Sequence, residues 1–257
     1  MLDASAWVGT WAFAPSQRVA LAGLVRTLTV AGLAGAAVSP VEAVLAPEPM
    51  AANRHLLAAA ARRRAGDFAI VPVPILDPSL PAWREHLAEC SAQRGDVLRA
   101  VKIVPNYHEY SLGAPAVAAL AAELARRDLG LCVQLRLADE RAHRPSLVVP
   151  GVDPACVTAL AVAQPDLRVL VCGAYMSDLA VLAPAANIAT ELSFVESGYL
   201  LRDALAHLGP DRLLLGTHAP LHYAAPGVAK LGADALSPGV SAQLGTDNFR
   251  RFFGMMT

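Results

Sequence analysis

The stretch that decides the fold is 98–137, where two short runs of branched apolar residues flank an alanine-rich segment. Residues 98–104 read Leu-Arg-Ala-Val-Lys-Ile-Val, and residues 131–137 read Leu-Cys-Val-Gln-Leu-Arg-Leu. Between them a segment of helical period runs from about Pro115 to Arg127. Short runs rich in Val, Ile and Leu are typical of buried strands, and two of them joined by a helix predict a parallel β-α-β unit.

The same unit recurs along the whole chain. Strands are predicted at Met1–Val8, Ala34–Ser39, Phe68–Ile75, Leu98–Val104, Leu131–Leu137, Arg168–Cys172, Ile188–Ser193 and Arg212–Thr217. Helices are predicted at Gln17–Gly32, Met50–Ala65, Pro81–Gln93, Pro115–Arg127, Pro154–Ala163, Ser177–Leu182, Tyr199–Leu208, Ala224–Ala233 and Val240–Phe253. Eight evenly spaced strands without a linker predict an α/β fold in which residues 1–257 form one (β/α)8 barrel domain, a fold that takes about 250 residues.

An open, doubly wound sheet is the alternative to the closed barrel. That fold expects a glycine-rich GxGxxG loop after the first strand. The residues there are Val8, Gly9, Thr10 and Trp11, which do not supply it. The sequence therefore favours the barrel.

The composition excludes several classes of protein. Hydrophobic residues make up 55% of the chain and charged residues 17%, with a mean hydropathy of +0.42, which argues against disorder. The uncharged stretch Thr27–Val41 falls short of the roughly 18 apolar residues of a spanning helix, so we expect no membrane segment. A net charge of −1 argues against nucleic acid as a partner.

The cysteines and the N-terminal region predict a cytoplasmic protein. No pair of the four cysteines has CxxC spacing, so we expect buried free thiols at Cys90, Cys132, Cys156 and Cys172. The first basic residue is Arg18, whereas a signal peptide carries its positive charge at the start.

Polar residues stand near the ends of five strands that are otherwise apolar. In a (β/α)8 barrel the active site lies at the C-terminal ends of the strands, and residues two apart share a face. On the first strand we expect one face to carry Asp3, Ser5 and Trp7, and the other Leu2, Ala4, Ala6 and Val8. The other strands contribute Lys102, Gln134, Arg136, Glu191, Ser193 and His218. Buried charges need partners, so these residues either pair with a ligand or form a network that only fills the barrel.

Four stretches carry a resemblance to a known family. They are Leu-Asp-Ala-Ser-Ala-Trp-Val-Gly at 2–9, Val-Lys-Ile-Val-Pro-Asn-Tyr-His at 101–108, Arg-Leu-Leu-Leu-Gly-Thr-His-Ala-Pro at 212–220 and Asn-Phe-Arg-Arg-Phe-Phe-Gly at 248–254. Together they resemble the amidohydrolase-related family of the amidohydrolase superfamily, whose members are (β/α)8 barrels. The matching features are an opening Asp-x-His-x-His strand, a Lys-x-x-Pro segment, an Arg-Leu-Leu-Phe-Gly-Thr-Asp-x-Pro strand and a closing Asn-Ala-x-x-Leu-Phe-Gly helix.

The resemblance implies a histidine-bound divalent metal, usually zinc, but the corresponding positions differ here. The family's two first-strand histidines, its fifth-strand histidine, its sixth-strand histidine and its eighth-strand aspartate correspond to Ser5, Trp7, Arg136, the pair Cys172-Gly173 and His218. A catalytic zinc site needs about three protein ligands. Trp does not ligate metals and Arg is cationic, so we expect no metal and no cofactor. A relocated site built from His108, His143, His218 and His222 has no support in their spacing.

Two functional hypotheses follow. The first is a metal-free hydrolase or lyase acting on a small organic anion, in which His218 is the general base, Glu191 orients it or serves as the acid, and Lys102 neutralises a carboxylate or enolate. Substrate-binding residues would be Arg136, Asp3, Ser5, Trp7, Gln134, Asn106, Tyr107 and His108. Trp11 would help to wall the pocket, or would only pack at its rim.

The alternative is a non-catalytic barrel that binds a carboxylate-like ligand or a partner subunit. Such a partner would be a second copy of the chain or a homologue with intact histidines. The charged segment 139–145 would cover the pocket mouth, meet a partner or remain a solvated loop.

Overall fold

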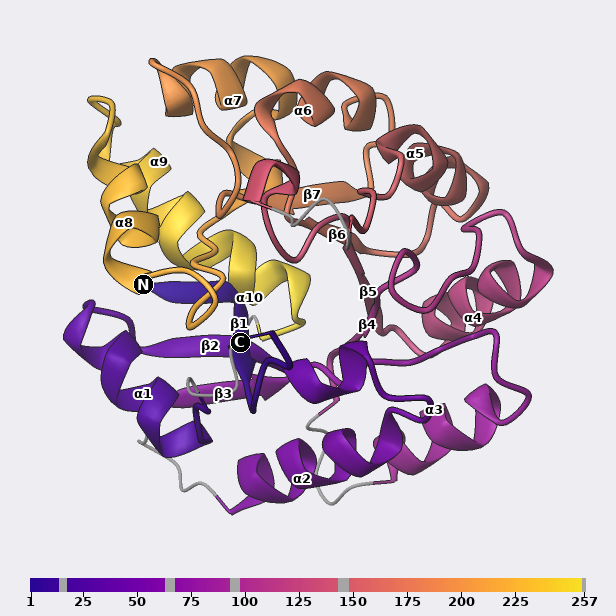
Figure 1. Ribbon diagram of the computed structural model, residues 1–257. Coiled ribbons are helices and arrows are strands. Elements are labelled where there is room, and N and C mark those ends of the chain that lie inside the picture. Colours follow the sequence, from indigo (N-terminus) through magenta and orange to yellow (C-terminus); the bar gives the residue numbers. More distant parts are fainter. Residues whose placement is uncertain (14–17, 63–67, 93–97, 143–147, 256–257) are drawn as a thin grey trace.

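Eight parallel strands close into a ring in the computed structural model, which describes residues 1–13, 18–62, 68–92, 98–142 and 148–255 (Figure 1). Hydrogen bonds order the strands as β1-β2-β3 and β4-β5-β6-β7-β8. Lys102 N donates to Pro74 O at 2.8 Å, which joins the third and fourth strands. Ala4 N donates to Leu215 O at 2.8 Å, which joins the eighth to the first and closes the barrel that the sequence predicts. The strands are β1 Leu2–Val8, β2 Gly35–Pro40, β3 Ala69–Pro72, β4 Ala100–Ile103, β5 Gly130–Gln134, β6 Val169–Cys172, β7 Ile188–Glu191 and β8 Leu213–Leu214.

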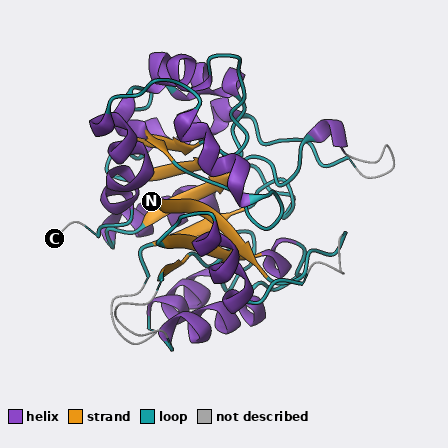
Figure 2. Ribbon diagram, turned by 90° about the vertical axis from the view of Figure 1, so that its left-hand side faces the viewer, coloured by secondary structure: helices purple, strands orange, loops and turns teal. Residues whose placement is uncertain are grey.

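Helices surround the strand ring in chain order (Figures 1 and 2). They are α1 Leu21–Val30, α2 Met50–Ala61, α3 Trp83–Ser91, α4 Pro115–Arg126, α5 Pro154–Ala163, α6 Met176–Leu182, α7 Leu200–Leu208, α8 Ala224–Ala229, α9 Pro238–Ala242 and α10 Asn248–Phe252. Every predicted helix is confirmed, and a π-helical turn at Gln243–Asp247 connects α9 to α10. Of the predicted helix ends, Gln17, Ala65 and Gln93 lie outside the described residues.

Several predicted boundaries differ from the structure. Helix α1 begins at Leu21, because Val19 instead forms an antiparallel bridge with Gly9. Strand β8 ends at Leu214 rather than at Thr217. The chain then turns, since His218 has a φ of +58° and the Ala219–Pro220 peptide bond is cis. His218 therefore lies beyond the strand that was predicted to end in it.

The predicted faces of β1 are wrong. The register of β1 against β2 shifts between Asp3 and Ala6, which is a bulge. Leu2 and Ala4 pack in a cluster with Cys132 of β5, whereas Ala6 and Val8 pack in the cluster that includes α1. The bulge changes which face the chain presents, so the alternation predicted along this strand does not hold.

Three packed clusters build the core. The largest lies between strands and helices. A second cluster combines inward residues of the strands with Phe249, Phe252 and Phe253 at the C-terminal end of the chain. A third, with Trp7, Ile75, Val104 and Leu137, lies towards the strand ends.

Three of the four cysteines are buried as predicted, but Cys156 on α5 is exposed. This helix carries apolar residues on more than one face, so its composition does not mark the buried side. Within the described residues, no helix has the length and hydropathy needed to cross a membrane.

Candidate functional site

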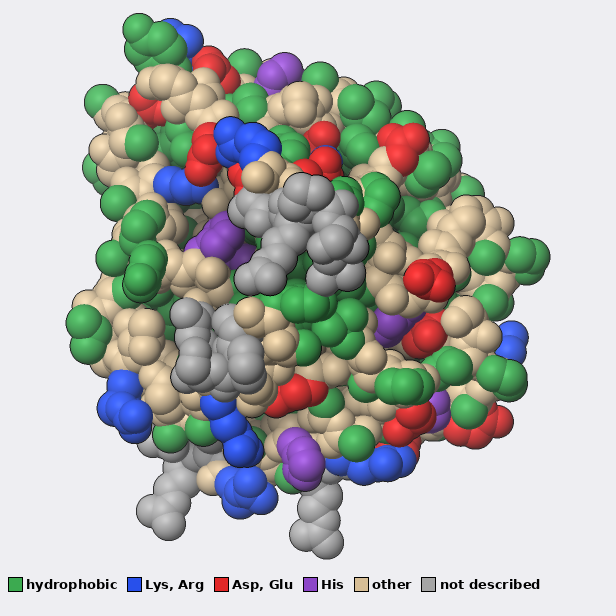
Figure 3. All heavy atoms as spheres, viewed as in Figure 1, with side chains coloured by type: hydrophobic (Ala, Val, Ile, Leu, Met, Phe, Trp, Pro, Cys, Tyr) green, Lys and Arg blue, Asp and Glu red, His purple; other side chains and the backbone are tan. Residues whose placement is uncertain are grey.

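The polar residues predicted from the strand ends form a buried layer inside the barrel. Eight of them are at most 8% exposed: Asp3, Ser5, Lys102, Gln134, Arg136, Glu191, Ser193 and His218. Trp7 is fully buried with them. Figure 3 shows the face at which the strands end, where hydrophobic side chains gather near the centre, beside residues that the structure does not describe. The exposed fractions show that the polar layer is shielded from solvent.

Trp7 and His218 are held together. The indole Nε1 of Trp7 donates to Nδ1 of His218 at 3.1 Å, and the other ring nitrogen, Nε2, lies 2.9 Å from Leu137 O. Since Nδ1 accepts, Nε2 must carry the proton and donate to the carbonyl. Burial, followed by the neighbouring His222, lowers the pKa of His218 well below its usual 6.5. The ring is therefore neutral, and neither nitrogen has a free lone pair.

Lys102 lies over the face of the Trp7 ring. Its Nζ is 4.0 Å from the ring centroid, which is a cation–π contact, and it donates to Gln134 Oε1 at 3.2 Å. Gln134 in turn donates to Arg136 O at 2.6 Å. No carboxylate of the described residues lies within 4.0 Å of the Lys102 ammonium. The structure thus brings Lys102, Trp7, Gln134 and His218 together without an acid among them.

Arg136 is paired elsewhere. Its Nη1 donates to Asp178 Oδ2 at 2.6 Å and to Gly173 O at 3.1 Å, while Nε donates to Glu140 Oε1 at 3.2 Å. The guanidinium also stacks 3.9 Å over the Tyr175 ring. Asp178 was not predicted; its signal in the sequence is an acidic residue in the first turn of α6. In this arrangement the charge of Arg136 is already balanced by protein carboxylates.

Glu191 is held by backbone and hydroxyl donors. Gly173 N and Ser193 Oγ donate to Oε1 at 2.8 and 2.7 Å, and Ser193 N donates to Oε2 at 2.6 Å. A Cβ on Gly216 would lie 2.0 Å from Oε2. The carboxylate can therefore take this position only because residue 216, two residues after β8, is glycine. Glu191 does not contact His218 through a hydrogen bond, and the predicted orientation of that imidazole by Glu191 is absent among the described contacts.

Asp3 is tied to the chain beyond β8. Its Oδ1 accepts from Ser5 N at 3.0 Å and from Thr217 N at 2.9 Å, and Oδ2 bonds the Thr217 hydroxyl. Burial raises the pKa of Asp3 to about 7, although these hydrogen bonds oppose the shift. The nearby Ser5 hydroxyl is buried and has no hydrogen-bond partner among the described residues.

The predicted residues after β4 lie apart from this layer. Asn106 Nδ2 donates to the carbonyls of Leu135 and Pro150 at 3.2 and 3.1 Å. His108 Nε2 lies 3.1 Å from Ala43 O, and burial lowers its pKa. The Tyr107 ring lies 6.1 Å from that of Trp11, and burial raises the pKa of its phenol to about 12.

Two ring residues lie beside His218: Phe194, which was not predicted, and His222, which was considered only for a relocated metal site. The rings of Phe194 and His222 lie 5.1 and 5.0 Å from that of His218, and 4.7 Å from each other. Both follow strands in loops, where no periodicity marks them. With Trp7 they surround the imidazole.

The residues at this site do not fit the divalent metal that the resemblance implies. Within the described ranges, no group of three His, Cys, Asp or Glu side chains lies close enough to hold an ion. Trp7 stands at one of the two first-strand positions at which the family has histidine, and the Lys102 ammonium lies against its ring. His143, one of the histidines considered for a relocated site, lies outside the described residues.

Solved structures with the same fold match this chain, but neither a family model nor a curated protein matches it in sequence. The 5-carboxyvanillate decarboxylase of Sphingomonas paucimobilis is similar in structure, with a TM-score of 0.75 at 15% identity over 100% of this chain and 99% of that one. A dihydroxybenzoic acid decarboxylase from Polaromonas, with bound manganese and an inhibitor, gives a TM-score of 0.71 at 15% identity over 99% and 96%.

An amidohydrolase from Burkholderia multivorans with bound zinc is also similar, with a TM-score of 0.71 at 16% identity over 100% of both chains. These matches span whole chains, so the agreement covers the full barrel and not one β-α-β unit. They confirm the architecture that the sequence resemblance implied. The chain has a (β/α)8-barrel fold like that of these decarboxylases and this amidohydrolase.

Proposed function

We propose that this protein is a non-catalytic barrel that acts by binding a small organic anion or a partner subunit. The observation that carries this proposal is the pair of hydrogen bonds that hold both ring nitrogens of His218. A general base needs a lone pair within hydrogen-bond reach of the proton it removes. Here Trp7 takes that lone pair, and the ring is fully buried.

The surrounding residues support the same proposal. Arg136, predicted to bind substrate, is paired with Asp178 and Glu140. Glu191 accepts hydrogen bonds from Gly173 and Ser193, so it is satisfied without a substrate. The anion class is suggested by the fold neighbours, which include decarboxylases of carboxylated or hydroxylated aromatic compounds. The partner would be a second copy of the chain or a homologue with metal-binding histidines.

One observation favours a second candidate function, a metal-free lyase acting on a small organic anion. The Lys102 ammonium has one hydrogen-bond acceptor and no ion-pair partner among the described residues. A buried, unpaired cation favours an anionic partner, and fixed positive charge stabilises a developing carbanion or enolate. In that case Lys102 would be the catalytic residue, and the Trp7 ring would have to move to admit substrate.

Turnover and metal content separate the two candidates. We expect purified protein to hold no stoichiometric zinc or manganese and to convert no small aromatic carboxylate or ester, with or without added metal. Turnover that is lost in Lys102→Met, but kept in the exposed control His207→Ala, would overturn the proposal and establish the lyase.

Nuclear magnetic resonance of the imidazole nitrogens tests the geometry directly. We expect His218 to remain the neutral Nε2–H tautomer at pH values near 6.5, where an ordinary imidazole is half protonated, because its pKa lies well below the ordinary value. Trp7→Phe removes the donor to Nδ1, so that nitrogen should lose its hydrogen-bonded chemical shift. A His218 ring that titrates freely in the unmodified protein would contradict the hydrogen bonds that carry the proposal.

A further inference from the structure

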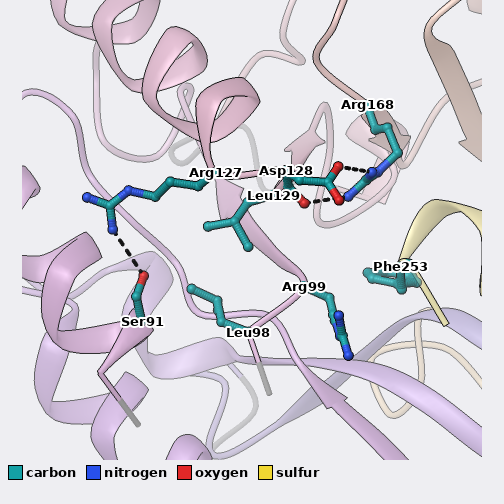
Figure 4. A pocket seen from close by; sticks show the side chains of 9 residues that line it. Ser91, Leu98, Arg99, Arg127, Asp128, Leu129, Arg168 and Phe253 are labelled. Carbon is teal, nitrogen blue, oxygen red and sulfur yellow. Dashed lines mark hydrogen bonds and ion pairs between the residues drawn. The ribbon is translucent and has the colours of Figure 1, made fainter. Parts of the chain in front are cut away.

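A cavity of about 280 Å³ opens at the N-terminal ends of the strands, away from the polar layer. Its walls include residues that directly precede three neighbouring strands: Arg99 before β4, Leu129 before β5 and Arg168 before β6. Phe253, just after α10, lies beside Arg99 in Figure 4. The described part of the cavity therefore includes the N-terminal ends of three neighbouring barrel strands.

The described lining of this cavity is strongly cationic. It carries three arginines and one acidic residue, Asp128. Arg127 lies at the far end, where Nε donates to Glu123 Oε1 at 2.6 Å and Nη1 reaches Ser91 Oγ at 3.4 Å (Figure 4). Since Glu123 balances Arg127 and Asp128 pairs with Arg168, the uncompensated charge is at Arg99.

Arg99 has no hydrogen bond or ion pair with any residue in the described part of the chain. It is nevertheless half-buried. The planar guanidinium of a half-buried arginine without an internal partner matches a carboxylate or phosphate in shape and charge. Arg99 therefore has all of its donors available to a ligand.

Arg168 is only loosely balanced. It forms an ion pair with Asp128, whose side chain is 86% exposed, and Nη2 donates to Asp128 O at 2.7 Å. An ion pair with so exposed a carboxylate contributes little and exchanges readily. The Arg168 Nε is buried and has no acceptor among the described residues, so Asp128 does not satisfy this side chain fully.

We propose that this cavity binds a small dianionic oxyanion, inorganic phosphate or a phosphate monoester, between Arg99 and Arg168. The anion takes the place of the Asp128 carboxylate against the Arg168 guanidinium. The planar guanidinium presents paired N–H donors that match two phosphate oxygens, and two such groups match a charge of two.

The size of the cavity agrees with a ligand of this class. Pockets for small molecules span about 300–1,000 Å³, and the cavity, at about 280 Å³, lies just below that range. It therefore has room for a phosphate head and a short organic group. The site lies at the opposite end of the barrel from His218, so it does not depend on whether the barrel is catalytic.

Calorimetric titration at low ionic strength tests the site, with inorganic phosphate and glycerol phosphate as probes. We expect saturable binding of phosphate, and no binding of chloride at matched ionic strength. Arg99→Gln should weaken phosphate binding at least about tenfold, because one charge-assisted contact is lost. Since Arg99 has no internal partner among the described residues, this change should leave the melting temperature unaltered.

Two further variants make the result specific. Asp128→Asn removes the competing carboxylate and should tighten phosphate binding. Arg202 is an exposed arginine on α7, so the control Arg202→Gln should leave phosphate affinity unchanged. Tighter binding of the monoester than of phosphate identifies an ester as the ligand, and equal binding identifies the free anion. No saturable binding of either probe, or equal affinity in Arg99→Gln and the unmodified protein, would overturn the proposal.

Discussion

The buried carboxyl of Asp3 predicts how the stability of this protein depends on pH. Burial raises its pKa from 3.8 to about 7 in the folded protein, while the unfolded chain keeps the ordinary value. Between these two values the folded state binds more protons than the unfolded state. The free energy of unfolding therefore falls as pH rises through this window, and the contribution of the protonated carboxyl is lost above about pH 7.

The size of the effect follows from the two pKa values. At about pH 5 the folded carboxyl is protonated and the unfolded one is mostly ionised, whereas at about pH 8 both are mostly ionised. Linkage then gives a loss of roughly 2–3 kcal/mol in unfolding free energy between these two conditions. This loss is large against the total stability of about 5–15 kcal/mol of a typical domain.

The substitution that isolates this contribution is Asp3→Asn. An amide has nearly the same shape, its oxygen still accepts from Ser5 N and Thr217 N, and its N–H₂ group donates to the Thr217 hydroxyl. The amide does not ionise, so the variant should not lose unfolding free energy between about pH 5 and pH 8 as the unmodified protein does. We therefore expect the unfolding free energy of the variant minus that of the unmodified protein to rise by roughly 2–3 kcal/mol over this range. Urea unfolding at a series of pH values measures this difference.

A matched control is Asp166→Asn, which makes the same chemical change on the surface. Its unfolding free energy should follow that of the unmodified protein at every pH. Parallel pH dependence of Asp3→Asn and the unmodified protein would show that Asp3 is ionised in the fold, and the reasoning from its burial would then be refuted.

Two further predictions concern packing and charge. Gly216→Ala places a Cβ 2.0 Å from Glu191 Oε2, so we expect the free energy of unfolding, measured with urea, to fall by at least about 1–3 kcal/mol. In the control Gly239→Ala the new Cβ meets nothing within 4 Å, and the free energy of unfolding should change by less than about 0.5 kcal/mol. Arg136→Met leaves the buried Asp178 without its cation and should cost about 3–5 kcal/mol; a smaller loss in the Asp178→Asn background would confirm the ion pair by a double-mutant cycle.

The barrel was predictable because its strands have a clear signal in the sequence. Parallel strands are covered on both faces and read as short, continuous apolar runs, and β4, β5 and β6 are buried at every position. Helix α5 matches its predicted bounds, since Asp153 caps its first turn and Pro154 takes the first helical position. Local chemistry was sufficient at these elements.

The bulge of β1 and the pairing of the polar residues were not predictable in the same way. Small residues such as Ala4 and Ser5 fit either face of a strand, so their pattern does not mark a bulge. The partners of His218 are Trp7 and Leu137, which are 211 and 81 positions away in the chain. Sequence spacing identifies which residues are polar at the strand ends, whereas tertiary packing decides which of them meet.

The polar layer differs from a catalytic site in how its hydrogen-bonding capacity is used. Catalytic groups keep donors or acceptors free for the reacting atoms. Asp3, Glu191 and His218 instead direct their acceptors and donors to fixed backbone and side-chain partners. Lys102 and Ser5 are the exceptions, because two of the three Lys102 N–H donors and the buried Ser5 hydroxyl have no partner in the described part of the chain. Of these two groups the Lys102 ammonium is the charged one, so Lys102→Met tests for chemistry at the strand ends more directly than a change at His218.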